Sequence, residues 1–129
     1  MQPTSGVLVD AVLLVAPDRG FMELAGVLTT SGCTVHSAAN QSAALESIRE
    51  DPPSVAIVNF RIYDPSVLNM CLAFAQSKPD LPLIVVGPKI DGREKAHVLA
   101  VGASDYVELP FDTVELVARI RSLIRRTSR

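Results

Sequence analysis

Cysteine is scarce in this sequence, and so is any excess of charge. Its 129 residues include only two cysteines, which are far apart and lack the CxxC spacing of a metal site or redox pair. We expect Cys33 and Cys71 to be small core residues in a reducing compartment. The formal net charge is −2 and the pI is about 5.6, whereas nucleic-acid-binding domains are usually basic. This balance argues against nucleic-acid binding, although the stretch from Arg119 to Arg129 is locally basic.

Long apolar runs and glycine-rich loops are also missing. No segment approaches the roughly 18 apolar residues of a membrane span. The apolar stretch from Val7 to Val15 is interrupted by Asp10 and follows no basic residue, so it does not resemble a secretory signal. We therefore predict a cytoplasmic protein with no membrane partner. The absence of a GxGxxG or Walker-type loop gives no support to a nucleotide site.

Alternating strand and helix signals fill the rest of the chain. Valine-rich and leucine-rich runs typical of strands buried on both faces alternate with amphipathic segments. Five such β–α units predict a doubly wound α/β fold: a parallel sheet of order 2-1-3-4-5 with helices on both faces. We expect a leader over 1–10, one domain over 11–126, and the start of a linker over 127–129. The predicted strands cover 11–16, 34–38, 55–60, 83–86 and 106–109.

Local signals predict where the helices begin and which faces they bury. Asp18 is placed to cap the first helix, and Asn40 the second. Asp64, before Pro65, is typical of a turn. In the fourth helix, over 91–101, we expect Ala96, Leu99 and Ala100 to face inward. In the last helix, capped by Asp112, the expected inner face is Val114, Val117, Ile120, Leu123 and Ile124.

Several motifs resemble those of response-regulator receiver domains, over about residues 11–126. The strongest are Gly102-Ala-Ser-Asp-Tyr106, the following Pro110-Phe111, and Glu115-Leu-Val-Ala-Arg-Ile-Arg121. The stretches Leu81–Val86 and Pro53–Val58 also fit. The resemblance is to the branch that contains winged-helix transcription factors, and it implies the same flavodoxin-like fold.

The resemblance also implies that the phosphorylation chemistry is lost. The position of the phosphate-accepting aspartate is Asn59, whose neutral amide is a poor nucleophile. The two acids that hold Mg²⁺ align with Ala16 and Pro17, which leaves only Asp18 one step further on. The hydroxyl residue aligns with Gly87 and the lysine with Leu109. We therefore predict a degenerate pseudo-receiver that is not an enzyme and uses no metal or cofactor.

Three interpretations of the altered cleft remain open. The first is a fold that keeps its packing without its chemistry. The second is a more apolar cleft for a small ligand, lined by Ala16, Pro17, Gly87, Leu109 and Tyr106, with Asn59 as a donor and acceptor. The third makes Asp64 or Asp18 a substitute phosphate acceptor, although phosphoryl charge would then go uncompensated.

A second surface looks less altered than the cleft. The resemblance implies a homodimer through the fourth helix, fifth strand and fifth helix, held in part by the pairs Lys95–Glu115 and Asp105–Arg119. A third pair, at Ser104 and Arg121, is broken by the serine. Alternatively, Glu115 and Arg119 pair along one helix, because they are four residues apart.

Tyr106 matches the family's switch aromatic, and with Gly87 in place of the hydroxyl residue we expect it to keep one rotamer. We interpret the chain as a dimerisation or protein-interaction module. Other partners would be a second protein or a fused output domain.

Overall fold

Five parallel strands form the centre of the computed structural model, which describes residues 10–127. The sheet order is β2-β1-β3-β4-β5, which confirms the predicted doubly wound topology. The strands are β1 Ala11–Val15, β2 Thr34–Ala38, β3 Val55–Asn59, β4 Leu83–Gly87 and β5 Asp105–Glu108. The helices are α1 Phe21–Thr30, α2 Gln41–Glu50, α3 Pro65–Ser77, α4 Gly92–Ala100 and α5 Thr113–Thr127.

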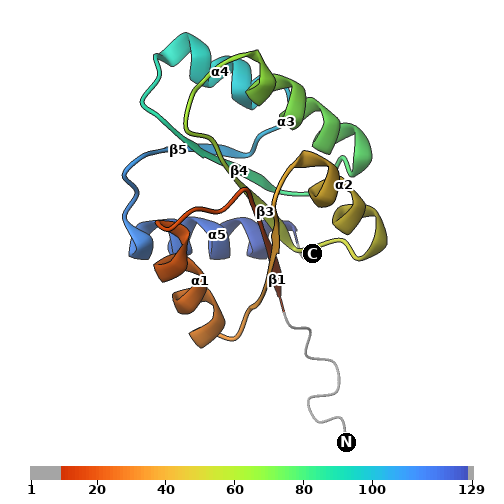
Figure 1. Ribbon diagram of the computed structural model, residues 1–129, viewed down its shortest axis with the longest axis vertical. Coiled ribbons are helices and arrows are strands. Elements are labelled where there is room, and N and C mark those ends of the chain that lie inside the picture. The colour runs from red at the N-terminus through yellow and green to blue at the C-terminus, as the bar shows by residue number, and fades with distance from the viewer. Residues whose placement is uncertain (1–9, 128–129) are drawn as a thin grey trace, which may run out of the picture.

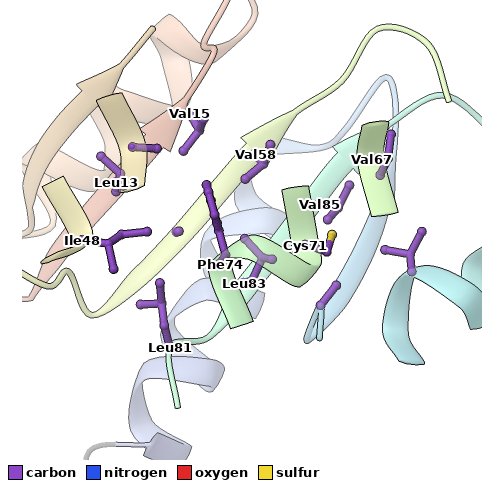
Figure 2. Packing of buried hydrophobic residues seen from close by; sticks show 14 of the residues in the cluster. Leu13, Val15, Ile48, Val58, Val67, Cys71, Phe74, Leu81, Leu83 and Val85 are labelled. Atoms are coloured by element: carbon purple, nitrogen blue, oxygen red, sulfur yellow. The ribbon is translucent and has the colours of Figure 1, made fainter. Parts of the chain in front are cut away.

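Helices cover both faces of this sheet (Figure 1). Side chains alternate along each strand, so that Leu13 and Val58 pack under α2, α3 and α4 while Leu14 and Ile57 pack under α1 and α5. Figure 2 shows the first of these layers, where Phe74 and Cys71 of α3 lie against Val58 and Val85 of the strands. The central strands are buried on both faces, as their continuous apolar runs predict.

Several predicted boundaries shift by a residue or two. β1 ends at Val15 instead of Ala16, because Ala16 has a φ of +54° and leaves the extended region. β3 ends at Asn59, one residue early, and β4 includes Gly87. The predicted leader and linker lie almost entirely outside the described residues, since only Asp10 and Thr127 are described.

Two predictions about helix starts are wrong. Asp18 does not cap α1: its Oδ1 accepts a hydrogen bond from the Gly20 amide at 3.0 Å, and Gly20 is the N-cap residue. Asp64 is not a free turn residue but the N-cap of α3, where it accepts from the Ser66 amide with Pro65 in the first turn. The predicted caps Asn40 and Asp112 are confirmed by their bonds from the Ala43 and Glu115 amides.

The predicted inner faces of α4 and α5 are also partly wrong. Val98 is the buried residue of α4, whereas Ala96, Leu99 and Ala100 are exposed. In α5, Leu116 takes the inner position and Val114 is 78% exposed. Both errors concern the rotation of the helix about its axis. When small or apolar residues are adjacent, periodicity alone does not decide which one faces the sheet.

Among the described residues, no helix is both long enough and apolar enough to cross a bilayer.

Candidate functional site: the carboxyl edge of the sheet and the α4–β5–α5 face

Asn59 joins the ends of β1 and β3 at the carboxyl edge of the sheet. Its Nδ2 donates to the Ala16 carbonyl oxygen and to Asp18 Oδ2, both at 3.1 Å. Only 7% of Asn59 is exposed, and its Oδ1 has no hydrogen-bond partner among the described residues. The side-chain amide of Asn59 therefore donates both of its hydrogens to oxygen atoms of the segment that follows β1.

This arrangement does not fit Mg²⁺, which the resemblance associates with this edge. Mg²⁺ prefers several oxygen ligands, usually including carboxylates. Among the residues that follow β1 and end β3 (Ala16, Pro17, Asp18 and Asn59), Asp18 supplies the one carboxylate, and its two oxygens already accept from Gly20 and Asn59. Ala16 and Pro17 have no side-chain oxygen. The side-chain nitrogen of Asn59 donates to Asp18, so it faces the carboxylate where a metal ion would have to bind. Among the described residues, no group of three or more His, Cys, Asp or Glu side chains could hold a metal ion.

Gly87 and Tyr106 meet where β4 ends. The Tyr106 hydroxyl donates to the Pro88 carbonyl oxygen at 2.6 Å, and the side chain is 8% exposed. A Cβ atom on Gly87 would lie only 2.6 Å from that hydroxyl. Burial, assisted by the charge of Glu108, raises the pKa of Tyr106 to about 12.

Leu109 lies next to Gly87, because its amide donates to the Gly87 carbonyl oxygen at 2.8 Å. Its side chain packs with Phe111 against the α1–α5 layer, whereas Tyr106 packs in the opposite layer. Phe111 in turn meets Phe21 edge to face, with ring centroids 5.6 Å apart. The backbone thus brings the predicted cleft residues together, but the side chains of Leu109 and Tyr106 belong to different layers of the core.

Ion pairs tie α4, β5 and α5 together on one side of the molecule. Lys95 of α4 pairs with Glu108 of β5 at 2.9 Å. Arg119 of α5 pairs with Asp105 of β5 at 2.6 Å and with Glu115 on its own helix at 2.8 Å. The hydrogen bond from Lys95 lowers the pKa of Glu108, and those to Glu115 and Asp105 raise the pKa of Arg119. All four predicted interface residues therefore have ionic partners within one chain, including the alternative pair Glu115–Arg119.

This α4–β5–α5 face, defined here by Lys95, Leu99, Asp105, Glu108 and Arg119, also has hollows and apolar area. A groove of about 470 Å³ follows α5, and another of about 330 Å³ lies where β5 meets α5. Leu99 is 45% exposed, beside exposed Ala96 and Ala100. The face combines apolar side chains with fixed charges, as protein interfaces do.

Sequence reasoning missed two residues of this region. Within one chain Lys95 pairs with Glu108, which was not predicted, while the pair Lys95–Glu115 between two subunits stays a prediction. The signal was present, because Glu108 is two residues after Tyr106 and a strand places such residues on the same face, here the one toward α4. Pro88 was missed as the acceptor for Tyr106, and the sequence contains no signal for a contact with a backbone carbonyl oxygen.

Comparison with known proteins decides the family. The model of the family described as "Response regulator receiver domain" matches residues 12–121, which is most of the chain. The chain belongs to the response regulator receiver family. The receiver is 34% identical over 117 residues to "Response regulator MprA" of Mycobacterium ulcerans (strain Agy99), covering 90% of this chain and 50% of that protein.

Solved structures agree on the fold. A CheY-like receiver domain protein from Methanospirillum hungatei JF-1 superposes with a TM-score of 0.81 at 18% identity, covering 93% of this chain and 97% of that one. A putative response regulator from Chloroflexus aurantiacus J-10-fl gives 0.80 at 26% identity, covering 92% and 100%. The receiver spans about half the length of the curated relatives that it matches.

Proposed function

We propose that this receiver is a non-phosphorylatable, degenerate member of its family that works by protein–protein association in the cytoplasm. The observation that carries the proposal is Asn59, a buried amide hydrogen-bonded to Ala16 and Asp18 at the position where the family places its phosphate acceptor. An amide nitrogen used as a double donor offers no carboxylate nucleophile for acyl-phosphate formation. The proposed domain is not an enzyme and needs no cofactor.

The associating surface that we propose is the α4–β5–α5 face, and the partner is a second copy of the chain. The ion pairs Lys95–Glu108 and Arg119–Asp105 hold three elements in register, and Leu99 of α4 supplies exposed apolar area. In a twofold dimer every contact is used twice, so modest apolar burial is doubled. The charges would set register and partner choice more than affinity.

The relatives suggest a wider setting for this module. Because the receiver covers about half of the "Response regulator MprA" proteins, we propose that it acts as the regulatory part of a longer regulator of the winged-helix branch. A fused output domain or a separate protein partner would then respond to association without phosphorylation.

Loss of phosphorylation is tested by intact mass spectrometry after incubation with acetyl phosphate and Mg²⁺. We expect no added phosphoryl group on the receiver. We expect none on Asn59→Asp either, because Ala16, Pro17, Gly87 and Leu109 remain. A receiver with a complete acidic site serves as the positive control, and labelling of the unmodified chain would refute the proposal.

Association is tested by sedimentation equilibrium over a concentration series without a phosphodonor. We expect a monomer–dimer equilibrium that Leu99→Glu shifts to monomer. Leu72→Glu is the matched control, since Leu72 is also 45% exposed but lies on α3, outside the proposed face. Asp105→Arg should also weaken the dimer, with exposed Asp80→Arg as its control. A monomer at every concentration would count against the homodimer, and equal effects of Leu99→Glu and Leu72→Glu would count against this face.

A second candidate function is small-ligand sensing at the altered cleft. The specific observation is the buried Oδ1 of Asn59, which accepts no hydrogen bond from residues 10–127, the part of the chain that the structure describes. A small molecule with an N–H or O–H group would satisfy it, and ligand binding to the folded state raises the melting temperature by mass action. A thermal-shift screen tests this candidate. A compound that raises the melting temperature of the wild type but not of Asn59→Leu would support it. If no compound raises the melting temperature, ligand sensing fails and the interaction module is the remaining proposal.

A further inference from the structure

A groove separates the amino-terminal parts of α3 and α4, two helices that lie side by side over the same core layer (Figure 1). Its volume is about 380 Å³, which lies at the lower end of the range that proteins use to bind ligands. Its lining residues come from the β3–α3 loop, the first turn of α3 and one side of α4, and they are Tyr63, Asp64, Pro65, Leu68, Glu94 and His97. We call this hollow the α3–α4 groove.

The helix α4 presents different residues to this groove and to the α4–β5–α5 face. Val98 is the buried residue of the helix. With about 3.6 residues per turn, Glu94 and His97 fall on one side of Val98, where they line the groove. Lys95 and Leu99 fall on the other side, in the α4–β5–α5 face. A partner in the groove therefore does not need the residues of that face.

Apolar side chains line part of the α3–α4 groove and continue next to it along the chain. Pro65 and Leu68 line it from α3, and Tyr63 and His97 add two aromatic rings. Ile62, directly before Tyr63, is 70% exposed and is one of the most exposed large apolar residues that the structure describes. Exposed apolar side chains gathered in one region mark surfaces that interact with other molecules.

Two carboxylates of the groove carry negative charge. Neither Asp64 nor Glu94 forms an ion pair with another residue of the described range 10–127. Hydrogen bonds from the Ser66 side chain and amide lower the pKa of Asp64, which favours its ionised form. Burial, followed by the charges of Glu94 and Asp91, raises the pKa of Tyr63. The surroundings of the Tyr63 ring are thus negative, and a cation is the complementary occupant.

We propose that the α3–α4 groove is a docking surface for a basic, apolar segment of a partner protein. An arginine of the segment would pair with Asp64 or Glu94 and lie against the Tyr63 ring, because a planar guanidinium both binds carboxylates and stacks on aromatic rings. A neighbouring apolar side chain of the segment would cover Ile62 and Leu68. A free small cation would satisfy the charges but leave these apolar side chains in water. The groove is a property of the single chain, so the proposal does not rest on the homodimer.

Fluorescence anisotropy of labelled peptides tests the docking. The probe is a peptide of about 12 residues that carries leucine and arginine on one helical face. In one matched peptide glutamate replaces arginine, and in another serine replaces leucine. We expect the leucine–arginine peptide to saturate the 129-residue chain and the other two to bind roughly tenfold more weakly or less. Equal binding of all three peptides, or no binding of the first, would overturn the proposal.

Removal of the two charges locates the binding on the groove. Asp64→Asn and Glu94→Gln keep the helix caps, because asparagine is a good N-cap residue and glutamine completes a capping box. The double variant should weaken the leucine–arginine peptide roughly tenfold, the order expected for the loss of two partly exposed ion pairs. The matched control, Glu46→Gln with Glu50→Gln, removes two exposed acids of α2. Equal weakening by both double variants would show that only net charge matters and would refute docking at the groove.

A serine substitution tests the apolar part of the surface. Ile62→Ser removes a side chain that is 70% exposed beside the groove, and Met22→Ser is the matched control, since Met22 is 72% exposed on α1. We expect Ile62→Ser to weaken the peptide severalfold and Met22→Ser to leave its affinity unchanged. Equal effects of the two substitutions would contradict the apolar contact.

Spermine, added as a competitor, distinguishes a protein segment from a free cation. We expect it to displace the leucine–arginine peptide only at concentrations far above the dissociation constant of the peptide. If spermine displaces the peptide at comparable concentrations, the groove is a site for small cations and the proposed segment is wrong.

Heteronuclear NMR spectra of the chain with the peptide separate this proposal from the homodimer. We expect the peptide to shift the amide signals of residues 62–68 and 93–98 and to leave those of β5 nearly unchanged. Leu99→Glu should bind the peptide as the wild type does, whether or not the wild type dimerises. Shifts centred on β5 and α5 would place the peptide on the α4–β5–α5 face and would rule out the α3–α4 groove as its docking surface.

Discussion

Asn59 determines the character of the carboxyl edge at the scale of single residues. Its amide hydrogens face two oxygens, so the buried group is satisfied without a net charge. A carboxylate at the same place would put two acids and a carbonyl oxygen together with no hydrogen between them. Burial of an uncompensated charge typically costs about 3–5 kcal/mol.

We therefore predict that Asn59→Asp lowers the free energy of unfolding by about 3 kcal/mol at neutral pH. Burial and the neighbouring Asp18 should raise the pKa of the new carboxyl, so the loss should shrink as pH falls and the group is protonated. Urea titrations at pH 7.5 and pH 5 measure both effects. Asn40→Asp is the control, because aspartate caps α2 as well as asparagine does. Equal stability of Asn59→Asp and wild type would contradict this account.

Element-scale behaviour is clearest in α5, whose two faces differ sharply. Leu116 is 1% exposed and packs in the layer that covers β1 and β3, whereas Val114, two residues earlier, lies in solvent. The helix begins at Thr113 after Asp112, which accepts from the Glu115 amide. The start of the helix fixes its rotation, and the rotation decides which apolar residue is buried.

From this difference we predict that Leu116→Ala destabilises the domain by about 2–5 kcal/mol, since it leaves a cavity in a packed core. Val114→Ala removes apolar atoms from an exposed site and should change the stability by less than about 0.5 kcal/mol. Chemical denaturation of the two variants measures the contrast. If the two losses were similar, the helix would be rotated relative to the structure described here.

The whole molecule consists of two core layers that share one sheet. Neither layer is complete without the strands, because alternate residues of each strand belong to opposite layers. A domain of this size with shared strands should unfold in a single cooperative step.

We predict coincident urea transitions by far-ultraviolet circular dichroism, which reports all helices, and by tyrosine fluorescence, which reports the α3–α4 side. The experiment is best done at a concentration where the chain is monomeric, because association would shift the midpoint by mass action. A tyrosine transition that precedes the loss of helix would show that the α3–α4 layer opens by itself.

The sequence alone determined the strand order, the alternation of elements and the replaced cleft residues. Continuous apolar runs and five β–α units allow few other topologies, and substitutions such as Asn59 and Gly87 are visible by position. Tertiary structure decided matters that depend on rotation and distance. These were the exposure of Leu99 and Val114, the partner of Lys95, and the Tyr106 hydroxyl in the space beside Gly87. The reason is physical: periodicity fixes that an element has two faces, but only packing against the sheet fixes which residues meet.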